Sequence, residues 1–309
     1  MALIERFSGR PDPETPFGEM VANPAIKRPL SYQMLFMNAL DLDAEALALA
    51  IRAYHPTLDK ARVELVEVLL ENVPEEEAGS IIGLAGWANH VVKLVGFNAK
   101  IPDAAFETCV RPAHFSMQLK EEAKQHKSHL LLYYAGYEAD PLEQYVALTV
   151  VAAALSRFGA ILLLNEAGRS AFPAEALLVD DPDHDSLEML RAMPIPLLYG
   201  GFVKIEIDGE PGVWMRTFGN SLLNLPDLAF KAEGHHQGSE TFDMFANMLD
   251  YLRQSGSTIA PGHTMQIGDD VHFRMRTRSA EEWFLESDGD MLVAEKMAEA
   301  GGNRVELPA

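Results

Sequence analysis

Apolar stretches of strand length alternate with apolar positions at helical spacing through the first third of the chain. Strand faces repeat every two residues and helix faces every three to four, so the two patterns can be distinguished. The predicted elements are a strand at 32–37, a helix that Asp41 or Asp43 caps and that runs to Tyr54, a strand at 62–70, and a hairpin of 80–85 and 90–97. This β-α-β-β order predicts a ferredoxin-like N-terminal half.

The longest apolar stretch, residues 145–164, has the length of a membrane-spanning helix. A break at residues 156–159, with serine, arginine and glycine, interrupts it. We therefore predict a buried helix at 141–158, which begins with Pro141 because a proline in the first turn loses no hydrogen bond. A buried strand at 160–164 follows, and no membrane association is expected.

The second half of the chain mixes strands and helices without strict alternation. The predicted elements are a hairpin of 199–207 and 213–218, an amphipathic helix that Ser239 caps and Gly256 closes, and a strand at 271–277. The whole pattern predicts an α+β fold with mixed, mostly antiparallel sheets and packed helices.

Composition along the chain predicts four segments. They are a loosely ordered Pro-rich arm at 1–28, an N-terminal α+β half at 29–195, a C-terminal α+β half at 196–278, and an acidic tail at 279–309. Within the tail, Phe284 and Leu285 are the residues that could pack against the folded body.

The charge is strongly one-sided. The 309 residues include 46 acidic and 25 basic side chains, a formal net charge of −21. Such a field repels nucleic acid and attracts a basic protein. The alternating arginines Arg274, Arg276 and Arg278 are interpreted as a solvated strand face that balances nearby carboxylates. We predict a basic protein partner and no nucleic-acid partner.

The single cysteine, Cys109, excludes an internal disulfide and a cysteine-rich zinc site. It lies in the apolar-periodic run 104–110, which predicts a small buried hydrophobe and not a nucleophile. Residues 1–6 lack the apolar region of a secretory signal, so a cytoplasmic location is expected.

Nucleotide-binding and hydrolase signatures do not occur in the sequence. It contains no P-loop, no dinucleotide-binding glycine pattern, no G-x-S-x-G elbow and no H-E-x-x-H motif. The commonest enzyme classes are therefore not indicated, and no cofactor is predicted. Whether the protein is an enzyme stays open, and a binding role is favoured.

Histidines supply the candidates for a metal site. Glu122, His126 and His129 follow at short spacing, and His235 stands in a polar loop before a helix. A histidine near a helix C-terminus commonly complements the helix dipole, and His129 is predicted to begin a strand. We therefore predict no metal site, and keep His126, His129 and His235 as the residues that a metal sensor would use.

A strand end followed by a glycine-hinged loop supplies the candidate binding residues. Arg216 and Thr217 close the predicted strand before Gly219, and Arg216 could hold a carboxylate or phosphate in a bidentate manner. Asp227, Glu240 and His263 are the other members of this candidate site. The alternative is structural: Arg216 would form a salt bridge to Asp227 or Glu240.

Three segments carry a resemblance to a known family: 126–132, 213–219 and the ending 256–265. Together they resemble an uncharacterised bacterial family, the domain of unknown function DUF4261, over about residues 30–276 and best after Pro194. The last family motif resembles Gly-Asp-Thr, and this chain has His263 in place of the acidic residue. The resemblance implies a bacterial cytosolic protein and supplies no catalytic residues.

These observations favour a non-catalytic acidic protein that binds a protein partner, of the toxin-neutralising or secretion-associated type. The first alternative is a hydrolase or phosphate-handling enzyme with a pocket around Arg216, Asp227, Glu240 and His263. The second alternative is a sensor of a small molecule or metal.

Overall fold

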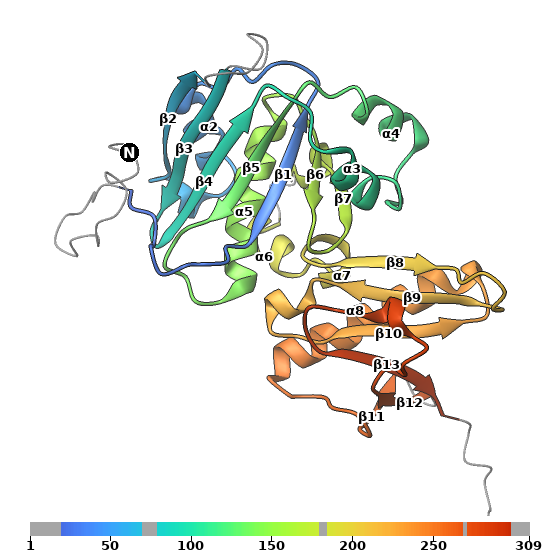
Figure 1. Cartoon of the computed structure of the whole chain (residues 1–309). Coiled ribbons are helices and arrows are strands. Elements are labelled where there is room, and N and C mark those ends of the chain that lie inside the picture. Colours follow the sequence, from blue (N-terminus) through green and yellow to red (C-terminus); the bar gives the residue numbers. More distant parts are fainter. Residues whose placement is uncertain (1–19, 70–78, 179–183, 268–270, 298–309) are drawn as a thin grey trace, which may run out of the picture. The chain divides into compact units, whose positions relative to one another are not determined.

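A computed structural model of the chain describes residues 20–69, 79–178, 184–267 and 271–297. Within these residues, seven α-helices and thirteen strands form two mostly antiparallel sheets, so the predicted α+β class is confirmed. The chain divides into two compact units (Figure 1). Unit 1 comprises Met1–Met193 with Leu197–Tyr199, and unit 2 comprises Pro194–Pro196 with Gly200–Ala309.

Unit 1 contains a seven-stranded antiparallel sheet in the order β2-β3-β4-β5-β1-β6-β7. Its strands are β1 (Ser31–Phe36), β2 (Arg62–Leu69), β3 (Gly79–Trp87), β4 (His90–Phe97), β5 (Ser128–Tyr134), β6 (Ala160–Asn165) and β7 (Ser170–Pro173). The predicted hairpin is confirmed, because β3 and β4 pair in antiparallel register with Trp87 opposite His90. The ferredoxin-like character of this half stays a prediction.

Helices cover both faces of this sheet, as the burial of successive side chains on β1 requires. Met34 and Leu35 point to opposite faces, and both are fully buried. The helices of unit 1 are α2 (Ala44–Arg52), α3 (Asp103–Cys109), α4 (Met117–Ala123), α5 (Pro141–Ser156) and α6 (Ser186–Arg191). α5 is apolar all round and almost entirely buried, and Asp140 caps it, so the predicted buried helix is confirmed. The other predicted cap, Asp43 on α2, is confirmed as well.

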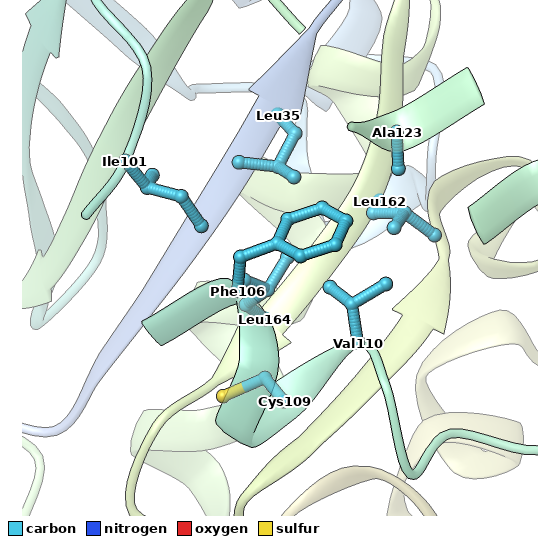
Figure 2. Close-up of a cluster of buried hydrophobic side chains, with 8 residues drawn as sticks. All are labelled: Leu35, Ile101, Phe106, Cys109, Val110, Ala123, Leu162 and Leu164. Carbon is cyan, nitrogen blue, oxygen red and sulfur yellow. The ribbon is translucent and has the colours of Figure 1, made fainter. Parts of the chain in front are cut away.

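Cys109 belongs to the core on the α3 side of the sheet. Its side chain lies with Leu35, Phe106 and Leu164 in a buried apolar cluster (Figure 2). Burial raises the pKa of the thiol to about 12, and the thiol faces the carbonyl oxygen of Asn165 at 3.8 Å. The prediction of a small buried hydrophobe is therefore confirmed.

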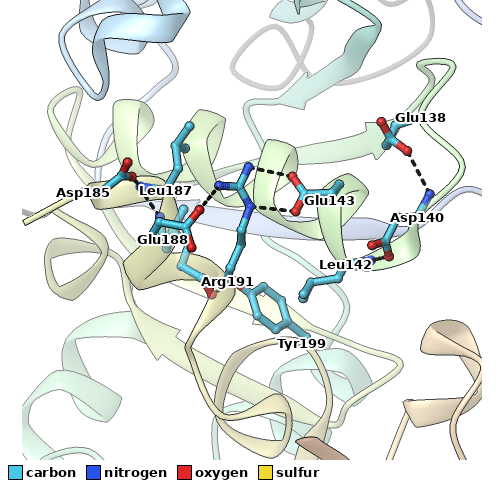
Figure 3. Close-up of polar contacts among 10 residues, drawn as sticks. Glu138, Asp140, Leu142, Glu143, Asp185, Leu187, Glu188, Arg191 and Tyr199 are labelled. Atoms are coloured by element: carbon cyan, nitrogen blue, oxygen red, sulfur yellow. Dashed lines mark hydrogen bonds and ion pairs between the residues drawn. The ribbon is translucent and has the colours of Figure 1, made fainter. Parts of the chain in front are cut away.

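An arginine clamp joins α6 to α5. Arg191 donates from Nε and Nη2 to the two carboxylate oxygens of Glu143, at 2.7 and 2.9 Å, and from Nη1 to Glu188 at 2.7 Å (Figure 3). Asp185 caps α6 by accepting from the backbone N–H groups of Leu187 and Glu188. A bidentate contact of this kind fixes the orientation of α6 as well as its position against α5.

The predicted Pro-rich arm falls mostly on residues 1–19, which lie outside the described residues. Its last part is packed on unit 1. Val21 is buried, and Asn23 donates from its backbone and its side chain to the carbonyl oxygens of Ala135 and Gly136.

Unit 2 is built on a six-stranded sheet in the order β11-β12-β13-β10-β9-β8. Its strands are β8 (Gly201–Ile205), β9 (Val213–Phe218), β10 (Asp227–Ala232), β11 (Thr264–Ile267), β12 (Val271–Arg276) and β13 (Met291–Lys296). β10 and β13 are parallel and the other pairs are antiparallel. The long helix α8 (Gly238–Ser255) packs on this sheet, and α7 (Ile195–Leu198) spans the division between the units.

Three details of unit 2 differ from the sequence predictions. Residues 291–296 form β13 inside the sheet and not an acidic tail, because Leu292, Val293 and Ala294 are buried between β10 and β12. The segment from Asp227 is a strand and not a loop. Ser239 lies inside α8, whose N-cap is Gln237, so its predicted capping role is wrong.

Among the described residues, every helix is too short or too polar to cross a lipid bilayer.

Candidate functional site

Three of the five predicted binding residues meet inside unit 2. Arg216 and Thr217 lie on β9 and Asp227 begins the neighbouring strand β10, where Ala229 pairs with Arg216. The three residues are at most 1% exposed. Burying an arginine is costly unless it is paired and hydrogen-bonded, so its surroundings reveal its role.

Arg216 donates from Nε to the carbonyl oxygen of Thr217 on its own strand, and two further acceptors come from the segment that follows β12. Its Nη1 donates to the backbone carbonyl oxygens of Phe284 and Glu286, at 3.1 and 3.0 Å. The guanidinium carbon lies 3.7 Å from the ring centroid of Phe218, and Nη2 lies 4.0 Å from the carboxylate of Asp227. Arg216 therefore fastens the chain around residues 284–286 to the face of the sheet.

Asp227 fastens the same segment from the other side. The hydroxyl of Ser287 donates to one of its carboxylate oxygens, and the backbone N–H of Asn220 donates to the other at 3.2 Å. Burial raises the pKa of Asp227, although these donors and Arg216 oppose the shift. Thr217 completes the group through its hydroxyl, which accepts from the backbone N–H of Leu228 at 2.8 Å. We call Arg216, Thr217, Asp227 and Ser287 the anchor.

The remaining two candidates do not join the anchor. Glu240 is exposed in the first turn of α8, and His263 is exposed in the turn before β11. Each lines a different hollow, that of Glu240 also including Phe273 and that of His263 including Tyr251. The expected pocket around Arg216, Asp227, Glu240 and His263 is therefore not formed, because its first two members are sealed inside the sheet packing.

The candidate metal residues are engaged elsewhere. His126 is buried, with Nδ1 2.7 Å from the carbonyl oxygen of Ala123 and Nε2 accepting from the backbone N–H of Ile101. His129 lies with Nδ1 2.6 Å from the carbonyl oxygen of Ala99. Burial lowers the pKa of both rings. His235 belongs to unit 2, where it meets Glu206.

Beside the anchor, the same face of the sheet is left open. A hollow of about 740 Å³ lies there, and we call it the acidic hollow. Its lining includes Glu210, Trp214, Lys231, Arg276, Glu281 and Phe284. Trp214 and Lys231 are direct cross-strand neighbours on β9 and β10, so the sheet register itself forms the floor.

A row of aromatic rings leads from the floor of the hollow to the surface. The rings of Trp214 and Phe284 meet edge to face with centroids 5.6 Å apart, and those of Phe284 and Trp283 with centroids 6.0 Å apart. Exposure changes along the row, from 5% for Trp214 to 71% for Trp283. The Nζ of Lys231 lies 5.7 Å above the centroid of Trp214.

Charged side chains surround these rings. Lys231 pairs with Glu210 at 3.0 Å, and Arg276 reaches both Glu282 and Glu295 at 2.6 Å. The prediction that the strand arginines balance nearby carboxylates is confirmed for Arg276.

Two further carboxylates of the lining, Glu233 and Glu281, are exposed. Neither makes an ion pair with another described residue. The hollow therefore offers aromatic surface and unpaired negative charge at the same place.

Sequence reasoning missed this hollow. In the sequence, Trp214 belongs to a segment that resembles the family, and Glu281 belongs to the predicted acidic tail. The one signal in the sequence is the order Glu281-Glu282-Trp283-Phe284, two acids followed by two aromatic residues. This order of residues indicates a site only once β13 is known, because β13 returns the chain to the sheet between β10 and β12.

Comparison with known proteins adds one finding. Residues 216–289 match the family described as Domain of unknown function (DUF4261). No curated protein and no solved structure matches the chain. The matched segment begins at Arg216 and ends at Gly289, so it contains the anchor, α8 and Trp283. It is shorter than the resemblance over about residues 30–276 that the sequence predicts. This match confirms the predicted family for one segment: residues 216–289 of unit 2 belong to DUF4261.

Proposed function

We propose that this protein is a non-catalytic acidic binding protein whose partner is a basic protein, and that the acidic hollow of unit 2 is the contact site. One observation carries the proposal: Trp283, 71% exposed, stands at the end of the aromatic row beside a hollow that holds unpaired carboxylates.

An exposed tryptophan next to a hollow is a strong indicator of a binding surface. Tryptophan combines a large apolar area with little conformational freedom, and it is enriched among the residues that dominate binding energy. Leaving Trp283 in water gives up the burial of that area, so a partner that covers it gains free energy.

Charge supports a basic partner. The net charge of −21 attracts cationic proteins at long range, and Glu233 and Glu281 supply local contacts at short range. The buried state of Arg216 and Asp227 also supports binding over catalysis, because these were the charged residues with the clearest catalytic potential.

The expected role is to hold or neutralise a basic protein, of the toxin-neutralising or secretion-associated type. We further propose a bacterial cytoplasmic setting. This part rests on the family resemblance and on a cysteine thiol that is buried and unpaired with another cysteine.

The experiment is capture of partners from a nuclease-treated native lysate on the immobilised full chain, at cell-like and at high salt. We expect a reproducible protein of high isoelectric point, retained at about 0.15 M salt and released well below 1 M, where screening shortens the Debye length to about 3 Å. A chain in which Glu233, Glu281 and Trp283 are all substituted should lose it. Recovery of no protein, or of acidic proteins only, would contradict the proposal.

A further inference from the structure

We propose that the acidic hollow receives an arginine side chain of the partner, stacked on the Trp283–Phe284 pair and paired with Glu281. This inference rests on the proposed function and names the side chain that the basic partner must supply. It is argued from the cations that the protein already holds at the same place.

Two of the cations that line the hollow, Lys231 and Arg276, are held by its carboxylates. Lys231 lies over the ring of Trp214 and pairs with Glu210. Arg276 forms a two-point contact with Glu282, from Nη1 at 2.7 Å and Nη2 at 2.6 Å. At Lys231 this lining therefore combines aromatic surface with a carboxylate, and at Arg276 it uses carboxylates.

A further pair of lining residues holds no cation. Phe284 and Glu281 both line the hollow, and the Glu281 carboxylate makes no ion pair with a described residue. The ring of Trp283 lies against that of Phe284 and is 71% exposed, so a side chain from another molecule can reach the aromatic pair.

These groups favour arginine over lysine. A guanidinium is planar, so it stacks on an indole ring while its edge N–H groups pair with a carboxylate, and it loses less hydration than an ammonium. Unit 2 shows this stacking in its own anchor, where the guanidinium carbon of Arg216 lies 3.7 Å from the Phe218 ring centroid.

The anchor also makes the site rigid. Arg216 restricts the movement of residues 283–286, because its Nη1 donates to the carbonyl oxygens of Phe284 and Glu286. These two residues lie on either side of Leu285, which is fully buried. A receptor that is already ordered spends less binding free energy on ordering. The aromatic pair is therefore presented in a fixed position.

The test uses two defined peptides and the full chain. One peptide is Gly-Arg-Gly-Arg-Gly-Arg-Gly, and the other has lysine in place of each arginine. Binding is measured by calorimetry at about 0.05 M salt, and Trp emission is recorded in parallel. We expect the arginine peptide to bind at least about fivefold more tightly than the lysine peptide, because only guanidinium stacks and pairs together.

Variants locate the binding. Trp283→Ala should weaken the arginine peptide by about tenfold or more, as a hot-spot residue does. Glu281→Gln should weaken it by about three- to tenfold through loss of the charge-assisted contact. The matched controls are Tyr251→Ala, an aromatic residue 56% exposed on α8, and Glu240→Gln, and both should change affinity by about twofold or less. Unchanged unfolding midpoints exclude misfolding, and Trp283→Phe should keep part of the affinity.

The outcomes separate this inference from the proposed function. Equal binding of the arginine peptide to the native chain and to Trp283→Ala overturns the inference and leaves a basic partner elsewhere on the surface. Equal affinity for the lysine peptide overturns the choice of arginine. If neither peptide binds while the lysate yields a basic partner, the inference alone is wrong; if the lysate also yields none, both are wrong.

Discussion

The two ends of one sheet face in unit 2 use the same residue types for opposite purposes. At the anchored end, Arg216 and Asp227 are buried, and their hydrogen bonds hold the segment after β12. At the open end, Lys231 and Arg276 pair with carboxylates and Lys231 lies over the ring of Trp214, but these groups border a hollow. Arginine, carboxylate and aromatic ring occur at both.

The two ends differ in their exposure to solvent. At the anchored end a lost partner leaves a buried charge without compensation, so the cost of disruption is large. At the open end water replaces a lost partner, so the ion pairs contribute little to stability and the charges remain available to a ligand. Stability should therefore depend on the first end and binding on the second.

The largest expected effect is on the anchor. Asp227→Ala leaves Arg216 buried without its carboxylate, and we expect the unfolding free energy to fall by about 3–5 kcal/mol. Glu210→Ala at the open end should cost at most about 1 kcal/mol. Denaturant unfolding followed by Trp fluorescence measures both. Equal losses would mean that the two ends do not differ as described.

The two tryptophans of the row give the next comparison. Trp214→Ala should cost about 3–5 kcal/mol, because the ring is buried in the core of the sheet face. Trp283→Ala should stay within about 0.5 kcal/mol, because its ring is mostly in water. Trp214→Phe is the matched control and should be milder than alanine, since the indole N–H makes no hydrogen bond with a described residue. A large loss for Trp283→Ala would assign it a structural role.

A smaller effect distinguishes the carboxylates by pH. Burial raises the pKa of Asp227, whereas hydrogen bonds from Arg276 lower the pKa of Glu282. The folded state then holds the Asp227 proton longer than the unfolded state, so this group's contribution to stability falls as pH rises from about 3.9 towards its folded pKa. The contribution of Glu282 is present above about pH 4.3 and is lost as pH falls through its folded pKa.

Carbon-detected NMR titration of the two carboxyl groups checks these signs. Each unit of pKa shift corresponds to about 1.4 kcal/mol between the two protonation states. Asp227 should titrate above the ordinary aspartate value and Glu282 below the ordinary glutamate value. The reverse order would show that the Asp227 carboxylate is held by its donors more strongly than burial opposes it.

The smallest effect is expected at Lys231. Lys231→Met removes a pair between side chains that are 42% and 48% exposed, so stability should change by about 0.5 kcal/mol or less. Affinity for the arginine peptide should rise by about two- to threefold, because one like charge leaves the hollow. Thermal melts and calorimetry measure the two quantities. A fall in affinity would mean that Lys231 itself contacts the ligand.

The sequence pattern alone predicts those elements whose defining residues are close together in the chain. α8 shows helical periodicity and ends at Gly256, which adopts the left-handed conformation of a helix C-cap. β3 and β4 are neighbours in sequence and pair as predicted. β13 was missed, because a short strand among acids is recognised only from its partners, and those are the distant strands β10 and β12.

The candidate site was predicted in part. The predicted strand end before a glycine-hinged loop indicates Arg216, Thr217 and Asp227 as candidate binding residues, and the structure brings them together. Their burial was not predictable, because it is produced by residues 284–287, about seventy positions away from Arg216. The acidic hollow needed the cross-strand register of four strands, which one sequence does not contain.

Hydrogen–deuterium exchange of the full chain, alone and with the captured basic partner, gives the most direct answer about where binding occurs. Slower exchange should appear in residues 279–286 and in the neighbouring part of β10, with α8 unchanged. Protection confined to α8 and β11, or to unit 1, would show that the partner binds elsewhere and that the exposed tryptophan has no part in recognition.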